Sequence, residues 1–337
     1  MSNVSVVIPN WNGAEALPAC IDSLKNQSLE LKIIVVENDS TDESFELLRN
    51  GYPEIEVVRN AENRGFAGGV NSGIRRAIQL GSEYVALLNN DAAADKDWLA
   101  GLVNALKANP KAGIATPKIL SSTGEYLDST GDLYTNWGLP YPRGRREAAL
   151  DKYDAEKEVF GASGGASLYR VKMLEEIGLF DEDFFAYYED IDISFRAQLA
   201  GWKVIYVPQA TVNHEISGTS RKIRGFGTYQ TMKNLPWLFW KNVPNELLLK
   251  MAPRFGFAYF AFYLSALVRG HALAATKGLL VSLTLLPKKL WQRFKIQRAK
   301  KVSARYINSI LTHDLPPNAR RLRALRSLWW TLRRRES

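Results

Sequence analysis

Residues Tyr84 to Asp91 read Tyr-Val-Ala-Leu-Leu-Asn-Asn-Asp, a short apolar run that ends in two amides and a carboxylate. A run of this length with aromatic and β-branched residues is typical of a strand buried on both faces of a sheet. Ligands of open α/β sheets bind at the carboxyl ends of such strands. We therefore expect Asn89, Asn90 and Asp91 to face a ligand, although Asn-Asn-Asp also suits a plain turn.

Two earlier stretches repeat this pattern. The run Val4 to Ile8 leads into Pro-Asn-Trp-Asn-Gly, and the run Lys32 to Val36 leads into Glu-Asn-Asp-Ser. Helices are expected over Ala14 to Lys25 and after Gly69, and such alternation predicts a mostly parallel sheet with helices on its faces. Parallel strands end at one edge, so the three polar stretches favour one shared site. The Gly- and Tyr-rich stretch Thr123 to Gly144 is predicted to form a long functional loop or lid.

Length and composition set the limits of the fold. With 337 residues, of which 46% are hydrophobic, the chain can bury a full core and is expected to form one large domain with an appendage. The single cysteine, Cys20, allows no intrachain disulfide and fits a reducing compartment. No basic segment followed by a long apolar one precedes the first strand, so we expect no secretory signal and a cytoplasmic main domain.

The net charge of +9 is divided unevenly along the chain. Residues 1–219 carry 20 Lys and Arg against 32 Asp and Glu, a net charge of −12, whereas residues 220–337 carry 24 against 3, a net charge of +21. Such asymmetry indicates a polyanionic partner for the basic part, either nucleic acid or an anionic membrane surface.

Apolar runs alternate with basic residues in this second part. The runs Phe255 to Val268 and Gly278 to Leu286 are shorter than the roughly 20 residues that span a bilayer. We expect helices that lie in the membrane interface, with basic side chains near anionic headgroups. The alternative is a helical subdomain packed on the main domain or on a second copy. Nucleic acid is not expected, since no known nucleic-acid-binding signature is present. The region ends in a basic cluster of Lys288, Lys289, Arg293, Lys295, Arg298, Lys300 and Lys301.

An ordered series of motifs runs along the first part of the chain. The blocks are Val-Ile-Pro-Asn-Trp-Asn-Gly from Val7, Val-Glu-Asn-Asp-Ser-Thr-Asp from Val36, Asn-Arg-Gly-Phe-Ala-Gly-Gly-Val-Asn from Asn63, Leu-Leu-Asn-Asn-Asp from Leu87, Gly-Ala-Ser-Gly-Gly-Ala from Gly161, Tyr-Glu-Asp-Ile-Asp from Tyr188, and His214 with Ser217 and Ser220. Over about residues 3–220 this order resembles the inverting glycosyltransferases of family two. Within that family it is most similar to bacterial rhamnosyltransferases that build surface polysaccharides.

This resemblance implies a GT-A fold over residues 1–220, a Rossmann-like α/β fold whose mostly parallel central sheet is flanked by helices. Residues 221–337 are then a basic amphipathic helical region that associates with the membrane. The implied reaction transfers L-rhamnose from dTDP-L-rhamnose, with inversion, to a lipid-linked saccharide. The enzyme would be cytoplasmic and peripheral on the inner face of the plasma membrane.

Other functions stay open at this point. The same fold can use UDP-galactofuranose, a UDP-hexose or a GDP-sugar, or can serve as a non-catalytic nucleotide-sugar-binding scaffold. A nucleotidyltransferase is disfavoured because no Gly-rich phosphate loop follows the first strand. A homo-oligomer is also possible.

The family's donor site maps onto strand ends and one turn. Glu37 can accept a hydrogen bond from the base, and Pro9 can form a wall beside it. Arg64, in a Gly-flanked turn, could meet phosphate oxygens or could form a surface salt bridge. The implied donor-binding residues are Pro9, Asn12, Glu37, Asn38, Arg64, Gly65, Asn71, Asn89 and Asn90. The implied acceptor-binding residues are Trp11, Gly164 and Gly165.

The resemblance also implies a divalent metal, Mn²⁺ or Mg²⁺. Asp91 matches the last acid of the family's Asp-any-Asp motif, while Asn89 replaces the first acid and removes one negative charge. His214 is the implied second ligand, and an imidazole shifts the preference toward Mn²⁺. A lone histidine after a strand is more often structural, so His214 ranks below Asp91.

Inversion requires a single base that deprotonates the acceptor hydroxyl. In the family this base follows the Glu of the acidic motif, which assigns the role to Asp190, with Glu189 as the second choice. Glu189, Asp190 and Asp192 lie at the start of a predicted helix whose apolar stripe runs from Ile191 to Leu199. We expect the acids to face away from the core. The alternative is that they only stabilise the helix dipole.

Overall fold

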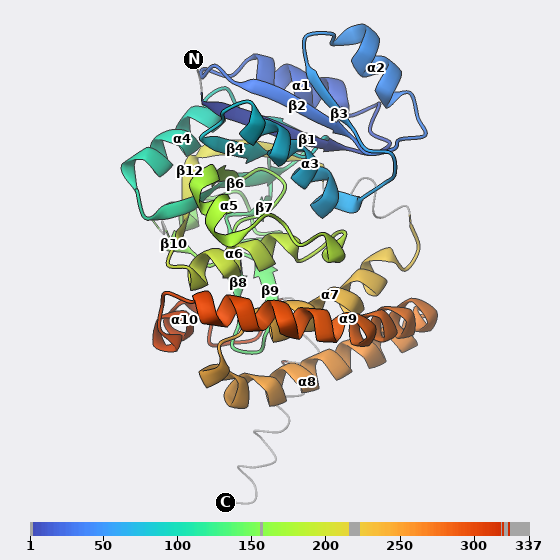
Figure 1. Cartoon of the computed structure of the whole chain (residues 1–337), viewed down its shortest axis with the longest axis vertical. Coiled ribbons are helices and arrows are strands. Elements are labelled where there is room, and N and C mark those ends of the chain that lie inside the picture. Colours follow the sequence, from blue (N-terminus) through green and yellow to red (C-terminus); the bar gives the residue numbers. More distant parts are fainter. Residues whose placement is uncertain (1–2, 156–157, 216–222, 318, 320–322, 324–337) are drawn as a thin grey trace, which may run out of the picture.

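The apolar runs form strands of one ten-stranded sheet (Figure 1). The computed structural model describes residues 3–155, 158–215, 223–317, 319 and 323. The strands are β1 (Val4–Asn10), β2 (Lys32–Glu37), β3 (Glu56–Arg59), β4 (Tyr84–Leu87), β5 (Ala92–Ala94), β6 (Ala112–Ser121), β7 (Leu127–Ser129), β8 (Asp132–Tyr134), β9 (Pro140–Pro142), β10 (Glu158–Val159), β11 (Leu168–Arg170) and β12 (Lys203–His214). The helices are α1 (Leu17–Lys25), α2 (Ser44–Gly51), α3 (Gly65–Gln79), α4 (Trp98–Ala108), α5 (Val171–Ile177), α6 (Glu189–Leu199), α7 (Phe226–Asn242), α8 (Asn245–Val268), α9 (Ala272–Ala299) and α10 (Ala304–Ile310), with short 3-10 turns η1 (Asp151–Tyr153) and η2 (Glu182–Phe184).

The sheet order is β10-β12-β6-β11-β4-β1-β2-β3, with β5 paired to β12 and β7 to β6, and β8 and β9 form a separate pair. Strand β1 runs parallel to β2 and β4, β2 to β3, and β6 to β12. Strands β10 and β11 are antiparallel to their neighbours. The predicted fold class is confirmed: a mixed α/β fold with a mostly parallel central sheet flanked by helices.

The three predicted strand ends lie side by side. In the register, Asn10 pairs with Glu37 and Val7 with Leu87, so β4, β1 and β2 end at one edge. Alternate side chains of β1 enter two different cores. Val6 packs in the core that contains α1 and α4, and Val7 packs in the core that contains α3. Burial on both faces explains why these strands read as continuous apolar runs.

Helix α3 begins at Gly65, four residues earlier than expected. Gly65 has a φ of +67°, and a Cβ there would lie 2.4 Å from the backbone oxygen of Phe185. Only glycine fits this position, because an L side chain would be strained and would also collide with that carbonyl. The helix ends before Gly81, which has a φ of +81° as expected for a C-terminal cap.

The Gly- and Tyr-rich stretch is packed into the protein rather than arranged as a lid. It forms β7, β8 and β9, and its Tyr134 and Leu139 are buried. The Tyr134 ring stacks on Phe160 with centroids 5.3 Å apart and meets Phe195 edge-on at 5.2 Å. This aromatic core also contains apolar residues of α6, α7 and α8, so it joins the sheet to the C-terminal helices.

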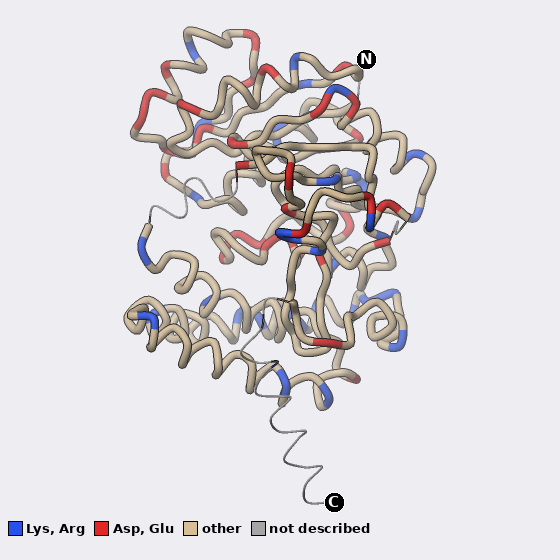
Figure 2. The backbone as a smooth tube through the Cα atoms, turned by 180° about the vertical axis from the view of Figure 1, so that it is seen from behind, with Lys and Arg blue, Asp and Glu red and all other residues tan. Residues whose placement is uncertain are grey.

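The C-terminal helices lie beneath the sheet domain (Figure 1). Trp237, Leu238 and Phe239 of α7 are fully buried. Seen from behind, acidic residues gather in the sheet domain, and the helices below carry mostly Lys and Arg (Figure 2). The predicted boundary between residues 220 and 221 lies outside the described residues.

Helix α8 is longer than its apolar run suggested. It begins at Asn245, continues through Pro253 and has 24 residues. By length and composition alone, α8 could cross a membrane, and it is the one such helix among the described residues. Core helices of soluble proteins also meet this criterion. Only 22% of its apolar window is buried.

Candidate active site

A chain of hydrogen bonds joins the ends of the three strands. The Asn90 side chain donates to Oδ1 of Asn10 at 2.8 Å, and Asn10 Nδ2 donates to Oε2 of Glu37 at 3.0 Å. The backbone N–H of Ser40 donates to the other oxygen of Glu37 at 2.7 Å. Glu37 is therefore buried with both carboxylate oxygens occupied, and Asn10, which the sequence reasoning did not single out, is the link.

Strand pairing brings Asp91 and His214 together. Strand β5 follows Asp91 and pairs antiparallel with the end of β12, so that Ala92 lies opposite His214. His214 Nε2 lies 3.2 Å from Oδ1 of Asp91 and 3.2 Å from Nδ2 of Asn89. His214 Nδ1 lies 3.0 Å from Oδ2 of Asp128 on β7. Burial disfavours protonation, but the contacts with Asp128 and Asp91 outweigh it and raise the pKa of His214 to about 9.

These residues fit a divalent cation that is completed by its substrate. Oδ1 of Asp91 is buried and accepts no hydrogen bond, although it faces the imidazole. Asp128 holds the opposite ring nitrogen, as carboxylates commonly do behind metal-bound histidines. Within the described ranges no group of three His, Cys, Asp or Glu forms a complete metal site. Asp91 and His214 would therefore supply two of the ligands of such a cation, and diphosphate oxygens would have to supply others.

The proposed base sits at the start of α6. Oδ2 of Asp190 accepts from the N–H of Gly164 at 3.1 Å, and Oδ1 accepts from the N–H of Ile191 at 2.8 Å. Burial raises the pKa of Asp190 even though these hydrogen bonds oppose the shift. Burial and the charge of Asp190 raise the pKa of Glu189 well above its usual range. Oε2 of Glu189 is buried without a hydrogen-bond partner, so it stays the second candidate.

Two acids and an arginine near the site were missed from the sequence. Asp132 is buried, and burial together with the charge of Asp190 raises its pKa. Asp128 holds His214 and also pairs with Nε of Arg145 at 3.0 Å. Asp128 and Asp132 lie within the stretch Thr123 to Gly144, and Arg145 follows it. The Gly and Tyr content of this stretch was the one sequence feature that indicated a functional role. Strands of three residues have too little periodicity to show which side chains point inward.

The turn before α6 is held by α7. Phe185, Tyr187 and Tyr188 all have φ between 64° and 73°, which is strained for non-glycine residues. Nδ2 of Asn234 donates to the backbone oxygens of Phe184, Ala186 and Tyr187, each at 2.9 Å. Asn234 is fully buried. The C-terminal helices thus determine the conformation of the turn that presents Asp190.

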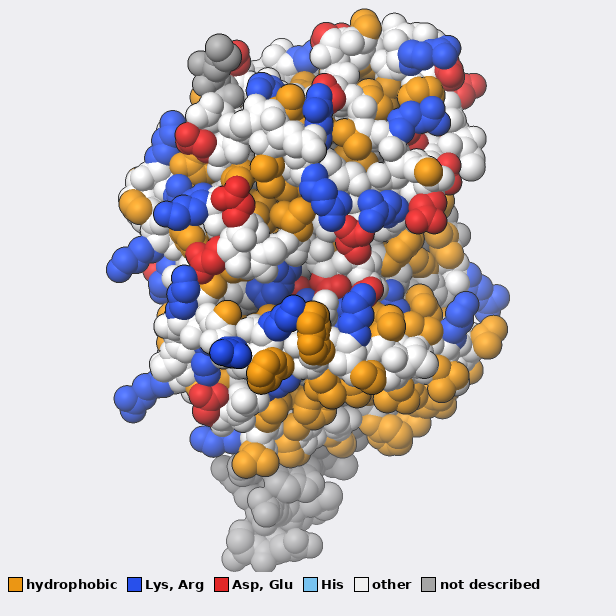
Figure 3. All heavy atoms as spheres, in the orientation of Figure 1, with side chains coloured by type: hydrophobic (Ala, Val, Ile, Leu, Met, Phe, Trp, Pro, Cys, Tyr) orange, Lys and Arg blue, Asp and Glu red, His pale blue; other side chains and the backbone are white. Residues whose placement is uncertain are grey.

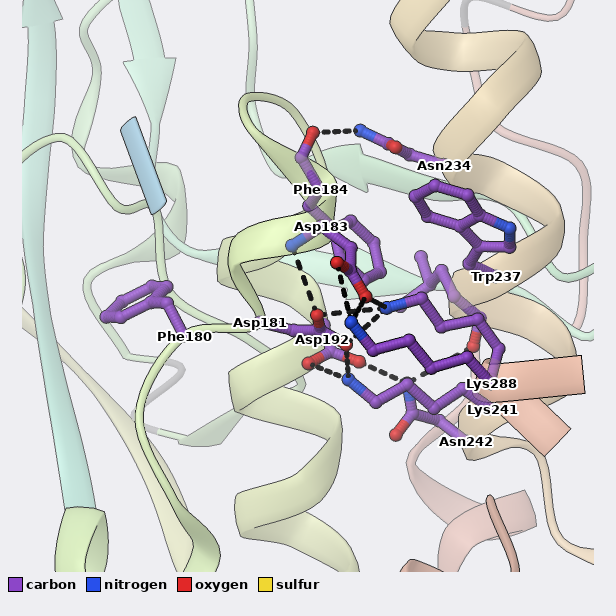
Figure 4. A network of polar contacts seen from close by, with 12 residues as sticks. Phe180, Asp181, Asp183, Phe184, Asp192, Asn234, Trp237, Lys241, Asn242 and Lys288 are labelled. Atoms are coloured by element: carbon purple, nitrogen blue, oxygen red, sulfur yellow. Dashed lines mark hydrogen bonds and ion pairs between the residues drawn. The ribbon is translucent and has the colours of Figure 1, made fainter. Parts of the chain in front are cut away.

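A buried ionic network joins the same regions (Figure 4). Lys241 Nζ lies 2.8 Å from Asp192 and 2.6 Å from Asp181. Lys289 lies 2.8 Å from Asp181 and 2.7 Å from Asp183. Burial opposes ionisation of Asp192, but Lys241 and Arg196 outweigh it and lower its pKa.

This network corrects two expectations. Asp192 does not face away from the core, because it is fully buried, and Lys241 of α7 and Arg196 of α6 supply its cations. Lys289 and Arg293 are buried rather than free for headgroups, and Arg293 donates to the backbone oxygen of Trp240 at 2.8 Å. Lys288 is exposed but pairs with Asp183.

A cavity of about 970 Å³ collects most of the predicted site. The predicted residues that line it are Pro9, Trp11, Asn38, Gly65, Asn89, Asn90, Asp91, Gly164, Gly165, Glu189, Asp190 and His214. Ser217 and Ser220, which complete the histidine motif, lie outside the described residues.

Four predicted donor residues are absent from this lining: Asn12, Glu37, Arg64 and Asn71. Arg64 pairs with Glu182 at 2.6 Å, as the salt-bridge alternative anticipated. Asn71 is buried and bonds the backbone of Phe180 through both its amide atoms. Oδ1 of Asn12 accepts from the N–H of Thr41 at 2.7 Å. Their donor contacts stay predictions, which would require these side chains to exchange partners within the protein for the nucleotide.

A sheet of this order, with a cavity at its strand ends, defines the fold class as GT-A. The solved structure of GalNAc-T7 with UDP, GalNAc and Mn²⁺ matches 71% of this chain and 50% of its own, with a TM-score of 0.54 and 17% identity. The mannosyltransferase PcManGT from Pyrobaculum calidifontis, solved with GDP-Man and Mn²⁺, matches 88% of this chain and 85% of its own, with a TM-score of 0.51 and 17% identity. At these identities the likeness shows the fold.

The sequence comparison defines the family. The profile of glycosyl transferase family 2 matches residues 5–178, more than half of the chain, so this chain belongs to that family. A relative is the N-acetylglucosaminyl-diphospho-decaprenol L-rhamnosyltransferase of Mycobacterium tuberculosis, which is 26% identical over 216 residues. The match covers 57% of this chain and 69% of the relative.

Proposed function

We propose that this glycosyltransferase transfers a sugar from a nucleoside-diphosphate sugar to a lipid-linked saccharide, with L-rhamnose from dTDP-L-rhamnose as the favoured donor. The observation that carries the proposal is a single cavity that contains both Asp91, at the strand ends, and Asp190, on α6. A donor held at the strand ends would place its anomeric carbon near the carboxylate that activates the acceptor. The printed name of the mycobacterial relative, an L-rhamnosyltransferase acting on a diphospho-decaprenol-linked sugar, supports this choice of substrates.

The proposed reaction inverts the anomeric carbon in one displacement. The acceptor hydroxyl oxygen forms a bond to that carbon as the bond to the diphosphate breaks, and Asp190 takes the hydroxyl proton. The N–H of Gly164 fixes one carboxylate oxygen of Asp190. Asp91 and His214 would hold a divalent cation, Mn²⁺ or Mg²⁺, which would neutralise charge on the departing diphosphate. The Mn²⁺ in two structural neighbours supports the metal.

We further propose that residues 1–220 carry the chemistry and that residues 221–337 attach the enzyme to the inner face of the plasma membrane. Exposed apolar side chains gather over α8 and α9 (Figure 3). They form a stripe on each helix: Leu249, Phe257, Phe260, Leu264, Leu267 and Val268 on α8, and Leu273, Leu280, Leu283, Leu290, Trp291 and Phe294 on α9. The chain has 12 Lys and Arg and no Asp or Glu between Glu246 and Asp314, and the part of this charge that is not buried, as Lys289 and Arg293 are, or paired, as Lys288 is, suits an anionic surface.

A donor panel tests the reaction. Nucleoside diphosphate release is measured from dTDP-rhamnose, UDP-galactofuranose, a UDP-hexose and a GDP-sugar, with Mn²⁺ and with or without an N-acetylglucosaminyl-diphospho-polyprenol. We expect acceptor-dependent release from dTDP-rhamnose. Release from another donor alone would replace the rhamnose assignment, and donor binding without any transfer would favour a scaffold.

Flotation tests the membrane proposal. The protein should float with vesicles that contain anionic phospholipid, and flotation should weaken as salt rises, because headgroup attraction is screened. Failure to float with anionic vesicles at low salt would contradict attachment through α8 and α9.

A further inference from the structure

The active-site cavity continues beyond the catalytic acids to the C-terminal helices. Its far part is lined by Phe226, Gly227 and Thr231 of α7, by Phe262 and Ala266 of α8, and by Arg269 just after α8. We call this far part the apolar arm. Most of its side chains are hydrophobic, in contrast to the asparagines and carboxylates at the strand ends.

Aromatic contacts connect the arm to the part of the cavity at the strand ends, where we propose that the donor binds. Phe185 packs against Gly65, where a Cβ would lie 2.6 Å from its ring. On the other side, the Phe185 ring lies 6.3 Å from the ring of Phe226, which lies 5.9 Å from that of Tyr187. These rings form a wall that runs from Gly65 at the strand ends, past the turn that precedes Asp190, into the arm.

The outer end of the arm lies at the exposed apolar stripe of α8. Phe262 and Ala266 line the arm, while Leu264, Leu267 and Val268 on the same turns are exposed. Arg269 is also exposed and, with Nε bonded to its own helix through Ser265, leaves a cation at the outer rim of the arm. A long apolar chain could therefore pass from the arm to the surface that we assign to the membrane.

We propose that the apolar arm binds the first isoprene units of a polyprenyl diphosphate, the carrier of the acceptor sugar. This inference rests on the proposed function, because a lipid-linked acceptor supplies the occupant. The saccharide lies at Asp190, the diphosphate follows at the inner end of the arm, and the isoprenoid runs through the arm and leaves it past Arg269 along α8. A water-soluble saccharide would leave the arm's apolar surface uncovered, whereas a long isoprenoid covers it.

Gly227 offers a way to fill the arm without disturbing the fold. A Cβ added at Gly227 meets no heavy atom within 4 Å, and the same holds for Gly256, which is on α8 outside the cavity. Gly227→Trp places an indole in the arm, and Gly256→Trp is the matched control on an exposed helix face. Thermal unfolding midpoints of the two variants show whether each one is folded.

The first readout is the ratio of kcat/KM for two acceptors with the same saccharide diphosphate, one on a long polyprenyl chain and one on a short alkyl chain. Gly227→Trp should lower this ratio at least about tenfold, since a displaced isoprene unit loses the burial of several methylene groups. Gly256→Trp should keep the wild-type ratio. Equal ratios in wild type and Gly227→Trp would overturn the inference while leaving the proposed function intact.

The second readout does not need turnover. A fluorescent long-chain polyprenyl diphosphate should bind wild type and Gly256→Trp in detergent, and Gly227→Trp about tenfold more weakly by the same loss of burial. Competition by unlabelled polyprenyl diphosphate, and not by phospholipid, is expected. Equal competition by phospholipid would make the arm a general acyl-chain site and overturn the assignment. If no donor reacts in the panel, this binding result alone decides the inference.

Discussion

The carboxylate of Asp192 lies 2.8 Å from the ammonium group of Lys241, and both side chains are buried between α6 and α7. The third acid of the Glu-Asp-Ile-Asp motif is thus an anchor for the C-terminal helices, two residues from the proposed base. The C-terminal helices that we propose to contact the membrane and the residues that we propose to perform the chemistry are therefore parts of one packed structure.

Removing this anchor should destabilise the fold. Asp192→Ala leaves Lys241 and Arg196 without one buried partner, which typically costs about 3–5 kcal/mol. Glu246→Ala is the control. The Glu246 side chain is exposed, so its pair with Lys300 is expected to contribute about 1 kcal/mol or less to the free energy of unfolding. Thermal or urea unfolding measures both. Equal losses would show that burial of the Asp192 pair has no special effect.

The same network predicts loss of stability in acid. Lys241 and Lys289 overcome the effect of burial and hold the pKa of Asp181 below its usual range, and the pKa of Asp192 is lowered as well. Groups with depressed pKa values stabilise the fold above their unfolded pKa of about 3.9, and this stability is lost as the pH falls below it. The unfolding free energy should drop through this acidic window, and less steeply in Asp192→Ala.

Asp190→Asn should abolish most transfer while nucleotide binding persists. A general base contributes roughly 10²- to 10⁴-fold to the rate and little to ground-state affinity. Turnover and nucleotide titration are compared for Asp190→Asn and Glu189→Gln. If Glu189→Gln loses turnover and Asp190→Asn retains it, the base is Glu189.

As the pH is lowered, activity should be lost at a higher pH than an aspartate base with an ordinary pKa would give. The base must be ionised, and burial raises the pKa of Asp190. The value of kcat/KM should therefore decline as the pH falls through this raised pKa, which can be read from a pH profile. A limb at the usual aspartate pKa of about 3.9 would contradict this environment for the base.

Asp91→Ala should weaken donor binding only when metal is present. Oδ1 of Asp91, which faces His214, is buried and accepts no hydrogen bond. Asp128→Asn, which alters the residue behind His214, should lower apparent metal affinity by about 10- to 100-fold. Nucleotide titrations with and without Mn²⁺ measure both effects. An affinity of Asp91→Ala equal to wild type in Mn²⁺ would remove Asp91 as a ligand.

Asn234→Ala should reduce kcat without a matching change in donor affinity. The variant frees three backbone oxygens in the turn that leads to Asp190, so the base loses its position while the strand ends are untouched. Leu235→Ala, at a buried neighbour in the aromatic core, controls for general destabilisation. If both variants lose kcat equally, the turn contacts have no specific role.

The sequence alone determined the class of fold, the family and the polar residues that end the three neighbouring strands. Runs such as Tyr84 to Leu87 are apolar because helices cover both faces of the sheet, and the residues after them meet at one edge because parallel strands end together. These patterns are local, so they can be read along the chain. The motif order then led to Asp190 and Asp91 as candidates.

Only the tertiary structure decided what surrounds them. Asp192 was expected on a polar face, yet it is fully buried, because Lys241, 49 residues away in the chain, compensates its charge together with Arg196. Asp128 and Asn234 had no local signal, since their contacts with His214 and with the turn before α6 arise from strand pairing and helix packing. Contacts of this kind depend on burial and charge summed over distant segments, which no local pattern of residues specifies.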